Sequence, residues 1–234
     1  MAPPPLRRVI RTGVERLPAR QDAPRHQHRH AYVTVVFAGA YRQDAYAGRL
    51  SIAAGDVVLQ PTFDCHADRM LSQGVELLRL PWGREATLGG VLDGCPVDEI
   101  RRAAARDVAE AADMVAGLIA ARPLRPRPMD HWSDELAAAI AADAGLQIGA
   151  WADAAGLSRE GVCRGFRAHY GVNPGRFRGE LRARAAWLRI TGGEAPLAAI
   201  AHELGFADQS HMTRAVKWLT GAAPSAWRAA AAGA

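Results

Sequence analysis

Residues 195–228, APLAAIAHELGFADQSHMTRAVKWLTGAAPSAWR, decide the fold of the C-terminal half of this 234-residue chain. An apolar stripe at helical spacing ends at Gly205, which supplies a backbone able to reach positive φ where the helix stops. Asp208 is a candidate cap for a second helix, which Gly221 ends before Pro224 opens a third. The pattern therefore predicts two short helices joined by a tight turn, followed by another helix.

The free face of the second predicted helix carries amide, hydroxyl and basic side chains. These are Gln209, Ser210, Thr213, Arg214 and Lys217. Such groups on a helix held by helix-turn-helix packing read base edges in the major groove of DNA. Taken alone, the stretch also fits a helical hairpin with a solvated polar face.

The same pattern occurs about fifty residues upstream, in GAWADAAGLSREGVCRGFRAHYGVNPGRFR (residues 149–178). The matching pairs are Gly156 and Gly205, Arg164 and Arg214, Gly171 and Gly221, Pro174 and Pro224, and Phe177 and Trp227. The first offset is 49 and the others are 50, so one extra residue lies in the second turn. An internal repeat indicates repeated architecture. Two such units, joined by a long helix over residues 174–190, are suited to successive major grooves roughly 34 Å apart.

Residues 130–230 resemble the DNA-binding domain of the AraC/XylS family of bacterial transcription regulators, most closely in IAHELGFADQSHMTRAVKWLTGAAPSAWR. The resemblance implies a seven-helix, double helix-turn-helix module. It places the base-reading positions on Glu160, Cys163, Arg164, Gln209, Ser210, Thr213 and Arg214, and we expect Arg167, Arg182 and Lys217 to hold phosphates.

Three departures from the family pattern bear on these roles. Gly161 and Gly165 lie inside the first recognition helix, where each costs about 1 kcal/mol relative to Ala. Cys163 is a weak hydrogen-bonding group for a base edge. Val216 is smaller than the aromatic residue that the family often buries there. We therefore expect the second recognition helix to dominate sequence readout, with Arg164 the best candidate in the first.

The charge distribution supports nucleic-acid binding by the C-terminal half. Residues 151–234 hold 11 Lys and Arg against 6 Asp and Glu, whereas residues 1–150 hold 18 of each. The whole net charge of +5 thus lies on the segment that contains the repeat. This is the electrostatic footprint of a phosphate-binding surface, although Arg-rich helices also occur in many other proteins.

The N-terminal half has a different pattern. Short apolar segments at 32–37, 49–52, 57–59 and 75–80 are separated by turn-forming residues, which favours an antiparallel all-β unit. The expected turn points are Gly39, Gly48, Gly55 and Gly74.

This half is similar to a small cupin-type barrel, the usual sensor domain ahead of an AraC-type DNA-binding half. The similarity rests on His28-x-His30 followed by Gly39, and on the segment from Gly55 to His66. Strand alternation predicts that His26, His28 and His30 share one face. His66 would come from a second strand, and since neighbours alternate, at most one of Cys65 and His66 faces inward.

This histidine set predicts an effector or metal pocket lined by His26, His28, His30, His66 and Cys65. Neutral imidazoles gathered in this way bind Zn, Fe, Cu or Ni. The carboxylate of metal cupins is missing, because Thr34 and Val35 occupy its region. Histidines that line a pocket or hydrogen-bond an organic effector are the alternative.

From 96 to 121 the apolar period changes to three and four, which predicts a long amphipathic helical region. The family resemblance implies that these helices pair two subunits, and packing on their own barrel is the alternative. The Pro/Arg segment 121–128 follows as a stiff linker, and a helix over 134–144 opens the next domain. We therefore expect three parts: residues 1–95, a cupin-like sensor; 96–128, a helical connector and linker; and 129–234, the DNA-binding domain.

The predicted fold class is α+β, and the predicted function is a DNA-binding transcription regulator, activator or repressor, that senses a small molecule or metal. Its expected partner is double-stranded DNA, with RNA polymerase, an effector and a second copy of the chain as further candidates. We expect no enzymatic activity. The alternatives are a metal-dependent cupin enzyme with a helical appendage and a DNA-repair alkyl acceptor, which Cys65, Cys95 and Cys163 support poorly because none has a reactive-site context.

The three cysteines show no CxxC pairing, and the N-terminus lacks the apolar segment of a secretory signal. No apolar run approaches the roughly 20 residues of a membrane span. These features predict a reduced, cytoplasmic protein with no membrane association.

Overall fold

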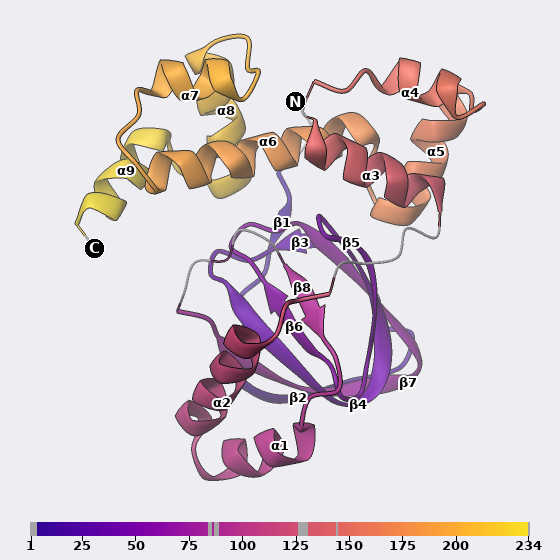
Figure 1. Ribbon diagram of the computed structural model, residues 1–234, viewed down its shortest axis with the longest axis vertical. Helices are drawn as coiled ribbons and strands as arrows, with labels where there is room; N and C mark the ends of the chain where they lie inside the picture. The colour runs from indigo at the N-terminus through magenta and orange to yellow at the C-terminus, as the bar shows by residue number, and fades with distance from the viewer. Residues whose placement is uncertain (1–3, 84–85, 87–88, 126–130, 144, 234) are drawn as a thin grey trace. The chain divides into compact units, whose positions relative to one another are not determined.

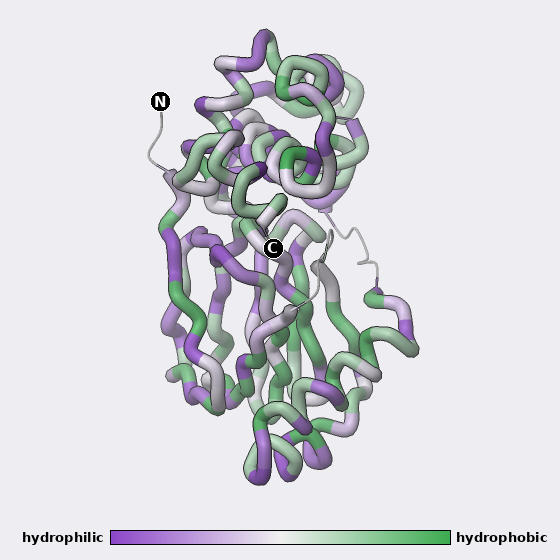
Figure 2. Tube along the Cα trace, turned by 90° about the vertical axis from the view of Figure 1, so that its left-hand side faces the viewer, coloured by the Kyte–Doolittle hydropathy of each residue, from purple (hydrophilic) through white to green (hydrophobic). Residues whose placement is uncertain are grey.

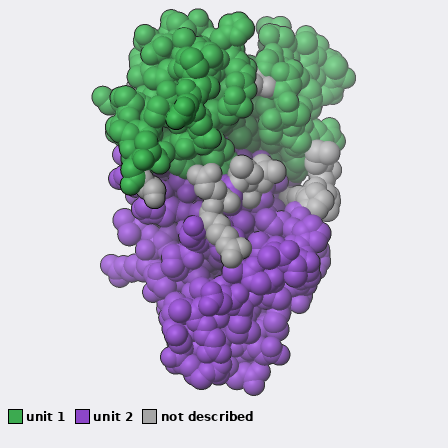
Figure 3. Space-filling model, turned by 60° about the vertical axis from the view of Figure 1, so that its left-hand side comes forward, with its two compact units in different colours: residues 1–5, 130–234 green, residues 6–129 purple. Residues whose placement is uncertain are grey.

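The computed structural model describes residues 4–83, 86, 89–125, 131–143 and 145–233. The chain divides into two compact units (Figure 3). Residues 6–129 form one unit, here called the sheet unit. Residues 130–234, with residues 1–5, form the other, here called the helical unit. The expected linker over 121–128 and the boundary at 128/129 lie partly outside the described residues.

The sheet unit contains an eight-stranded sheet that curves around its own interior (Figure 1). Its strand order is β1-β3-β7-β4-β6-β8, with β2 on β7 and β5 on β4. The strands are β1 (Leu6–Arg7), β2 (Gly13–Leu17), β3 (Ala23–Gln27), β4 (Tyr32–Ala45), β5 (Gly48–Ala53), β6 (Val57–Gln60), β7 (His66–Pro81) and β8 (Gly90–Leu92). Within the described residues, β1 and β8 end the path without pairing to each other. The expected small barrel is therefore a curved but unclosed sheet, since these two-residue and three-residue strands are too short to seal the gap.

The two central strands are longer than the apolar runs predicted. β4 has 14 residues and β7 has 16, and their register shifts beside Gly39. Gly39 has φ +79° and Gly74 has φ +68°, and both lie inside these strands, not in turns. A Cβ on Gly39 would lie 1.9 Å from the carbonyl oxygen of Gly74. The expectation of turns at these two positions was wrong, because a glycine at positive φ also permits a bulge in a continuous strand. Gly48 begins β5 directly after a turn, and Gly55 lies in the turn before β6.

The amphipathic region after the sheet forms two helices, not one. α1 (Val97–Arg106) and α2 (Val108–Ala121) are separated by Asp107, whose extended backbone and side chain cap α2. Ile100 and Val115 are buried in one apolar cluster with strand residues such as Val33 and Leu80. Both helices therefore pack on the sheet and belong to the sheet unit. A role in pairing two subunits stays a prediction.

The helical unit contains the seven helices that the resemblance implied, counted over the described residues. They are α3 (Trp132–Ala142), α4 (Ile148–Ala154), α5 (Arg159–Tyr170), α6 (Pro174–Thr191), α7 (Leu197–Glu203), α8 (Gln209–Thr220) and α9 (Pro224–Ala232). Hydrophobic and hydrophilic residues are interspersed along these helices, as expected for helices with one buried face (Figure 2). None of the described helices, in either unit, combines the length and hydropathy that a membrane crossing requires.

The sequence repeat is reproduced in the backbone. α4 and α7 each have seven residues, and α5 and α8 each have twelve. Gly156 and Gly205 have φ of +68° and +67° at the two turns. The amide after each glycine donates to the equivalent helix carbonyl, at 2.9 Å in both units. The amides of these two bonds, in Leu157 and Phe206, are 49 positions apart, whereas the capping residues that follow, Ser158 and Asp208, are 50 apart. The extra residue of the second turn is therefore Ala207.

Each helix-turn-helix pair packs against an end of α6 through its own apolar cluster. In the second unit Met212 and Val216 are buried with Phe206 and with Ile190 of α6. In the first unit Phe166, Tyr170 and Phe177 have ring centroids 4.6–5.3 Å apart. Gly165 meets the indole of Trp132 so closely that a Cβ would lie 2.6 Å from it. The glycine that weakens α5 as a helix therefore permits the close approach of α3.

The cap of α8 gives a first prediction. Asp208 accepts a hydrogen bond of 2.6 Å from the amide of His211. We expect Asp208→Ala to lower the free energy of unfolding of the helical unit by about 1 kcal/mol, because an N-terminal amide loses its partner. Asp208→Asn keeps an acceptor and serves as the matched control. Urea unfolding followed by circular dichroism measures both, and equal stability of Asp208→Ala and the wild type would contradict the role of this cap.

Candidate nucleic-acid interface and histidine pocket

The second recognition helix, α8, is held by three fixed features. Asp208 caps its start, Gly221 ends it at φ +88°, and Met212 and Val216 bury its inner face. The predicted base-reading side chains of this helix lie outside that buried face, and Arg214 points directly away from it. Gln209, Ser210 and Arg214 are exposed, and Thr213 is half-buried. Among the described residues Arg214 makes no ion pair, so its guanidinium is available to a ligand.

The first recognition helix, α5, has the same construction. The Ser158 hydroxyl accepts from the amide of Gly161 at 3.0 Å, and Gly171 ends the helix at φ +73°. Its predicted base-reading residues Glu160, Cys163 and Arg164 are all exposed. Arg164 Nη1 lies 3.4 Å from a carboxylate oxygen of Glu160, one turn earlier. An exposed pair of this kind is worth less than about 1 kcal/mol, so it leaves Arg164 free to exchange partners.

The long helix α6 separates the two recognition units. The α4–α5 pair and the α7–α8 pair lie towards opposite ends of α6 (Figure 1). Its 18 residues rise by roughly 27 Å at 1.5 Å per residue. This rise is of the same order as the roughly 34 Å spacing of successive major grooves on one face of a DNA duplex.

The three predicted phosphate contacts have different surroundings. Arg167 and Lys217 are exposed near the C-terminal ends of α5 and α8. Arg182 is half-buried, its Nε donates to the Leu204 carbonyl at 3.0 Å, and its guanidinium lies 4.3 Å from the centre of the Phe206 ring. Burial lowers the pKa of Arg182. Arg182 is thus a structural link between α6 and the turn of the second unit, which its sequence position did not reveal.

In the sheet unit, three histidines converge. His26 on β3 pairs in register with His66 on β7, so their side chains share a face. His28 lies two residues beyond His26 and returns to the same side. One ring nitrogen from each of these buried imidazoles lies within 4.8 Å of those from the other two.

The structure separates this cluster from the other residues predicted to join it. His30 is exposed, because β3 ends at Gln27 and the strand alternation stops there. The histidine pair of the cluster is therefore His26-x-His28, and the expectation that three histidines share a strand face was wrong. Cys65 is buried but lies outside the cluster, as expected for a neighbour of the inward-facing His66.

Backbone carbonyls fix the tautomer of each clustered imidazole. The Nδ1 atoms of His26, His28 and His66 lie 2.9, 2.8 and 3.0 Å from the carbonyl oxygens of Pro24, Arg8 and Asp64. A carbonyl only accepts, so each Nδ1 carries the proton and each Nε2 is left as an acceptor. In the case of His66, the Tyr32 hydroxyl lies 3.3 Å from this Nε2 and donates to it.

Burial keeps these imidazoles neutral. It lowers the pKa of His26 to about 3 and that of His28 to about 4, and it places the pKa of His66 well below the usual value. Burial also raises the pKa of Asp68, which accepts from Gln43 Nε2 at 2.9 Å. Neutral imidazole is the form in which histidine binds metals.

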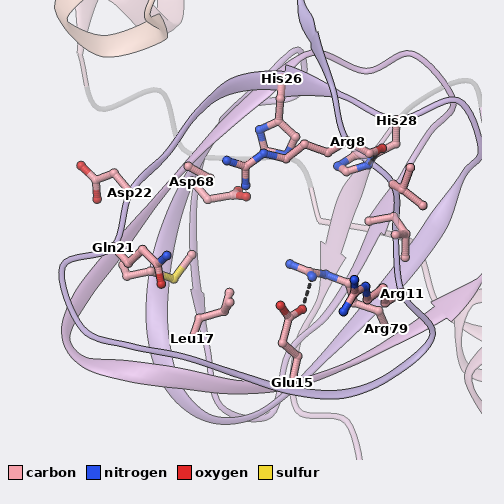
Figure 4. A pocket seen from close by; sticks show the side chains of 14 residues that line it. Arg8, Arg11, Glu15, Leu17, Gln21, Asp22, His26, His28, Asp68 and Arg79 are labelled. Atoms are coloured by element: carbon pink, nitrogen blue, oxygen red, sulfur yellow. Dashed lines mark hydrogen bonds and ion pairs between the residues drawn. The ribbon is translucent and has the colours of Figure 1, made fainter.

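A polar cavity of about 280 Å³ opens beside His26 and His28. Asp68 lies beside His26, and the ion pair of Glu15 with Arg79 lies across the cavity (Figure 4). The other charged lining residues are Arg8, Arg11 and Asp22. Sequence reasoning missed Asp68, although the spacing His66-x-Asp68 on an extended strand would have placed both on one face. It missed Arg79 and Glu15 because β2 and β7 are paired only by the tertiary fold.

Residues 151–230 match the model of a family described as a helix-turn-helix domain. The match spans both recognition helices and α6, with the matching caps and turns described above. The fold and this match define a DNA-binding helix-turn-helix protein. The helix-turn-helix part of the resemblance to the AraC/XylS family is thereby confirmed over residues 151–230. The strands and helices of the two units confirm the α+β fold class.

Among solved structures, the chain is similar to ToxT from Vibrio cholerae O395, at 11% identity and a TM-score of 0.43, over 96% of this chain and 98% of that one. It is also similar to unsaturated fatty acid-bound ToxT from Vibrio cholerae strain SCE256, at 12% identity and a TM-score of 0.41, over 93% and 94%. A probable AraC family transcriptional regulator from Rhodopseudomonas palustris gives 23% identity and a TM-score of 0.38, over 41% and 93%. The search of curated proteins gave no match.

Proposed function

We propose that this transcription regulator reads a specific DNA sequence with α8 and α5 and that a ligand in the sheet unit controls this binding. The observation that carries the proposal is the twice-built recognition helix, with Arg164 and Arg214 exposed at equivalent positions of a repeat that is conserved in the backbone. Two recognition helices of the same construction, one towards each end of α6, suit two consecutive segments of the DNA major groove.

The base contacts are assigned mainly to α8. Arg214 suits a bidentate contact with guanine, and Gln209 suits adenine. Ser210 and Thr213 add shorter contacts, and Arg164 leads the first helix because Cys163 is a weak partner for a base edge. Selection of bound fragments from randomised duplex DNA tests this proposal. A shared motif in two parts about one helical turn apart supports it, and recovery of random sequence only would contradict it.

Salt dependence separates the phosphate contacts from the base contacts. We expect Arg167→Ala and Lys217→Ala each to weaken binding to all duplexes and to reduce the slope of log affinity against log salt by about 1, because one fewer counterion is released. Arg182→Ala is the contrasting variant. It is expected to lower the stability of the helical unit and leave the slope unchanged, since Arg182 already binds Leu204 and Phe206. Fluorescence anisotropy across a salt series measures the slope, and unchanged slopes for both surface variants would contradict their role.

The cavity of the sheet unit supports the sensing part of the proposal. It is lined by charged groups of both signs and by histidine, so it suits a small polar ligand and not an apolar one. For control of DNA binding, the ligand must bind one arrangement of the protein more tightly than another. Repeating the DNA selection with pools of small polar molecules and metal ions tests this coupling.

A second candidate function is a metal-dependent reaction in the sheet unit. The observation that favours it is the cluster of three neutral imidazoles beside an open cavity. Turnover of a substrate by the full chain that is lost with His28→Gln, while DNA binding is unchanged by metal, would favour the enzyme over the sensor.

A further inference from the structure

We propose that Arg176, Glu180 and Trp218 form a clamp that fixes the angle of the second recognition helix on α6, and that this clamp sets the spacing of the two DNA segments that the protein accepts. The three are positioning residues for DNA recognition, so the inference rests on the function proposed above. It starts from the places where the two halves of the sequence repeat differ.

The first support comes from comparing the two halves of the repeat at the offset of 50 residues. Alanine occupies the positions equivalent to all three clamp residues, namely Ala226, Ala230 and Ala168. By contrast, Arg178 is repeated as Arg228. Each of these two arginines donates to a main-chain carbonyl just before its own helix-turn-helix pair, that of Leu146 or of Ala195. Arg178 and Arg228 therefore belong to the construction that both halves share, whereas the clamp residues do not.

The second support is that the three unrepeated side chains meet in the fold. Arg176 Nε donates to a carboxylate oxygen of Glu180 at 3.1 Å, one turn along α6. The guanidinium of Arg176 also lies 5.2 Å from the centre of the Trp218 ring on α8, within the range of a cation–π contact. The Glu180 side chain is fully buried, and a buried carboxylate requires a partner that neutralises it. Glu180 thus holds the Arg176 side chain along α6, against the ring of Trp218.

The clamp gives α8 a second point of attachment on α6. Met212 and Val216 of α8 pack with Ile190, near the end of α6. Trp218 contacts Arg176, which lies in the first turn of the same helix. Contacts near both ends of α6 fix the angle at which α8 crosses it, whereas a single contact leaves α8 free to pivot.

The start of α6 also supports the first recognition helix. The ring of Phe177, next to Arg176, lies 5.3 Å from the ring of Phe166 and 5.2 Å from that of Tyr170, both on α5. The clamp therefore joins α8 to the turn of α6 against which α5 packs. A change in the angle of α8 moves its base-reading side chains relative to those of α5, and so changes the spacing that both helices can read together.

The DNA experiment uses the full chain and the two-part sequence recovered by selection, with one or two base pairs inserted between the parts. Each inserted base pair moves one part by about 3.4 Å and turns it by roughly 35°. We expect the wild type to lose at least about 10-fold in affinity on insertion, and Trp218→Ala and Arg176→Ala to lose less than about 3-fold. Both replacements put alanine where the other half of the repeat already has it, so the helix-turn-helix construction accommodates them.

Arg189→Ala is the matched control. Arg189 is also an ion-paired arginine of α6, but its partner is Glu203 of α7 and both side chains are half exposed. This control is expected to keep the spacing selectivity of the wild type, and Trp218→Phe, which retains an aromatic face, is expected to keep most of it. The readout is the ratio of affinities for the two spacings, because lower stability or net charge weakens binding to both duplexes alike. Wild-type ratios in folded Trp218→Ala and Arg176→Ala would overturn the clamp.

A measurement without DNA separates the clamp from the proposed function. Cys163 on α5 is exposed, whereas Cys65 and Cys95 are buried, so a spin label reacts at Cys163. Ser210→Cys adds a second label on the exposed face of α8. Double electron–electron resonance then gives the distribution of distances between the two recognition helices, which we expect to broaden in both clamp variants and not in the control. Unchanged distributions would overturn the clamp even where DNA recognition is confirmed. If selection recovers no two-part sequence, the proposed function fails and these distances still decide the clamp.

Discussion

Arg214→Ala is expected to remove most of the sequence preference of the protein while weak, salt-sensitive DNA binding persists. Arg214 is exposed on α8, makes no ion pair among the described residues, and lies on the face opposite Met212 and Val216. A bidentate contact between arginine and guanine is worth about 1–3 kcal/mol of discrimination, which corresponds to roughly 5- to 150-fold. The phosphate contacts do not depend on sequence and are retained.

Two further variants make this experiment decisive. Arg106→Ala removes the same charge from α1 of the sheet unit, where Arg106 is paired with Glu110, and controls for net charge. Arg164→Ala removes the equivalent arginine of α5 and is expected to reduce discrimination less than Arg214→Ala, because α5 offers Cys163 where α8 offers Thr213. Footprinting on the selected sequence measures all three. An unchanged protected sequence with Arg214→Ala would contradict its role as the main base reader.

Gly39→Ala is expected to have the largest effect on stability, a loss of more than about 4 kcal/mol that unfolds the sheet unit. The new Cβ would lie 1.9 Å from the carbonyl oxygen of Gly74, a backbone atom of the paired strand β7. The side chain therefore has no room unless β4 and β7 separate. A non-glycine residue at φ +79° adds about 1–2 kcal/mol of backbone strain.

Gly55→Ala separates these two contributions. Gly55 has φ +95°, but a Cβ there meets nothing within 4 Å, so this variant has backbone strain without a clash. Hydrogen exchange read separately over residues 6–125 and 131–233 shows which unit loses protection. Loss confined to the sheet unit and much larger for Gly39→Ala is the expected result, and equal loss in the two variants would rule out the strand clash.

The C-terminal half was predictable because its determinants are local. Caps such as Asp208, helix ends such as Gly221, and turns at Gly156 and Gly205 act within a few residues of the chain. Because the pattern is repeated at an offset of 49–50 residues, each of these local signals occurs twice in the sequence. The exposed faces of α5 and α8 then follow from helical periodicity alone, which is why the base-reading candidates lie on the surface as expected.

Only the tertiary structure decided the histidine pocket. Which histidines meet depends on where β3 ends and on the register of β3 with β7, and both are settled by pairing between distant segments. A two-residue difference moved the pair from His28 and His30 to His26 and His28. Asp68 lies beside them for the same reason, and the contacts of the half-buried Arg182 with Leu204 and Phe206 are likewise long-range.

The amino-acid sequence by itself thus determined the DNA-binding domain with its repeated helix-turn-helix unit, because hydrogen-bonded caps, glycine turns and helical periodicity are properties of short segments. The tertiary structure decided what the sheet unit can bind, because a strand places its side chains only once its partners and register are set. Long-range pairing of β7 with β2, β3 and β4 creates that cavity and its three imidazoles, and no short segment contains it.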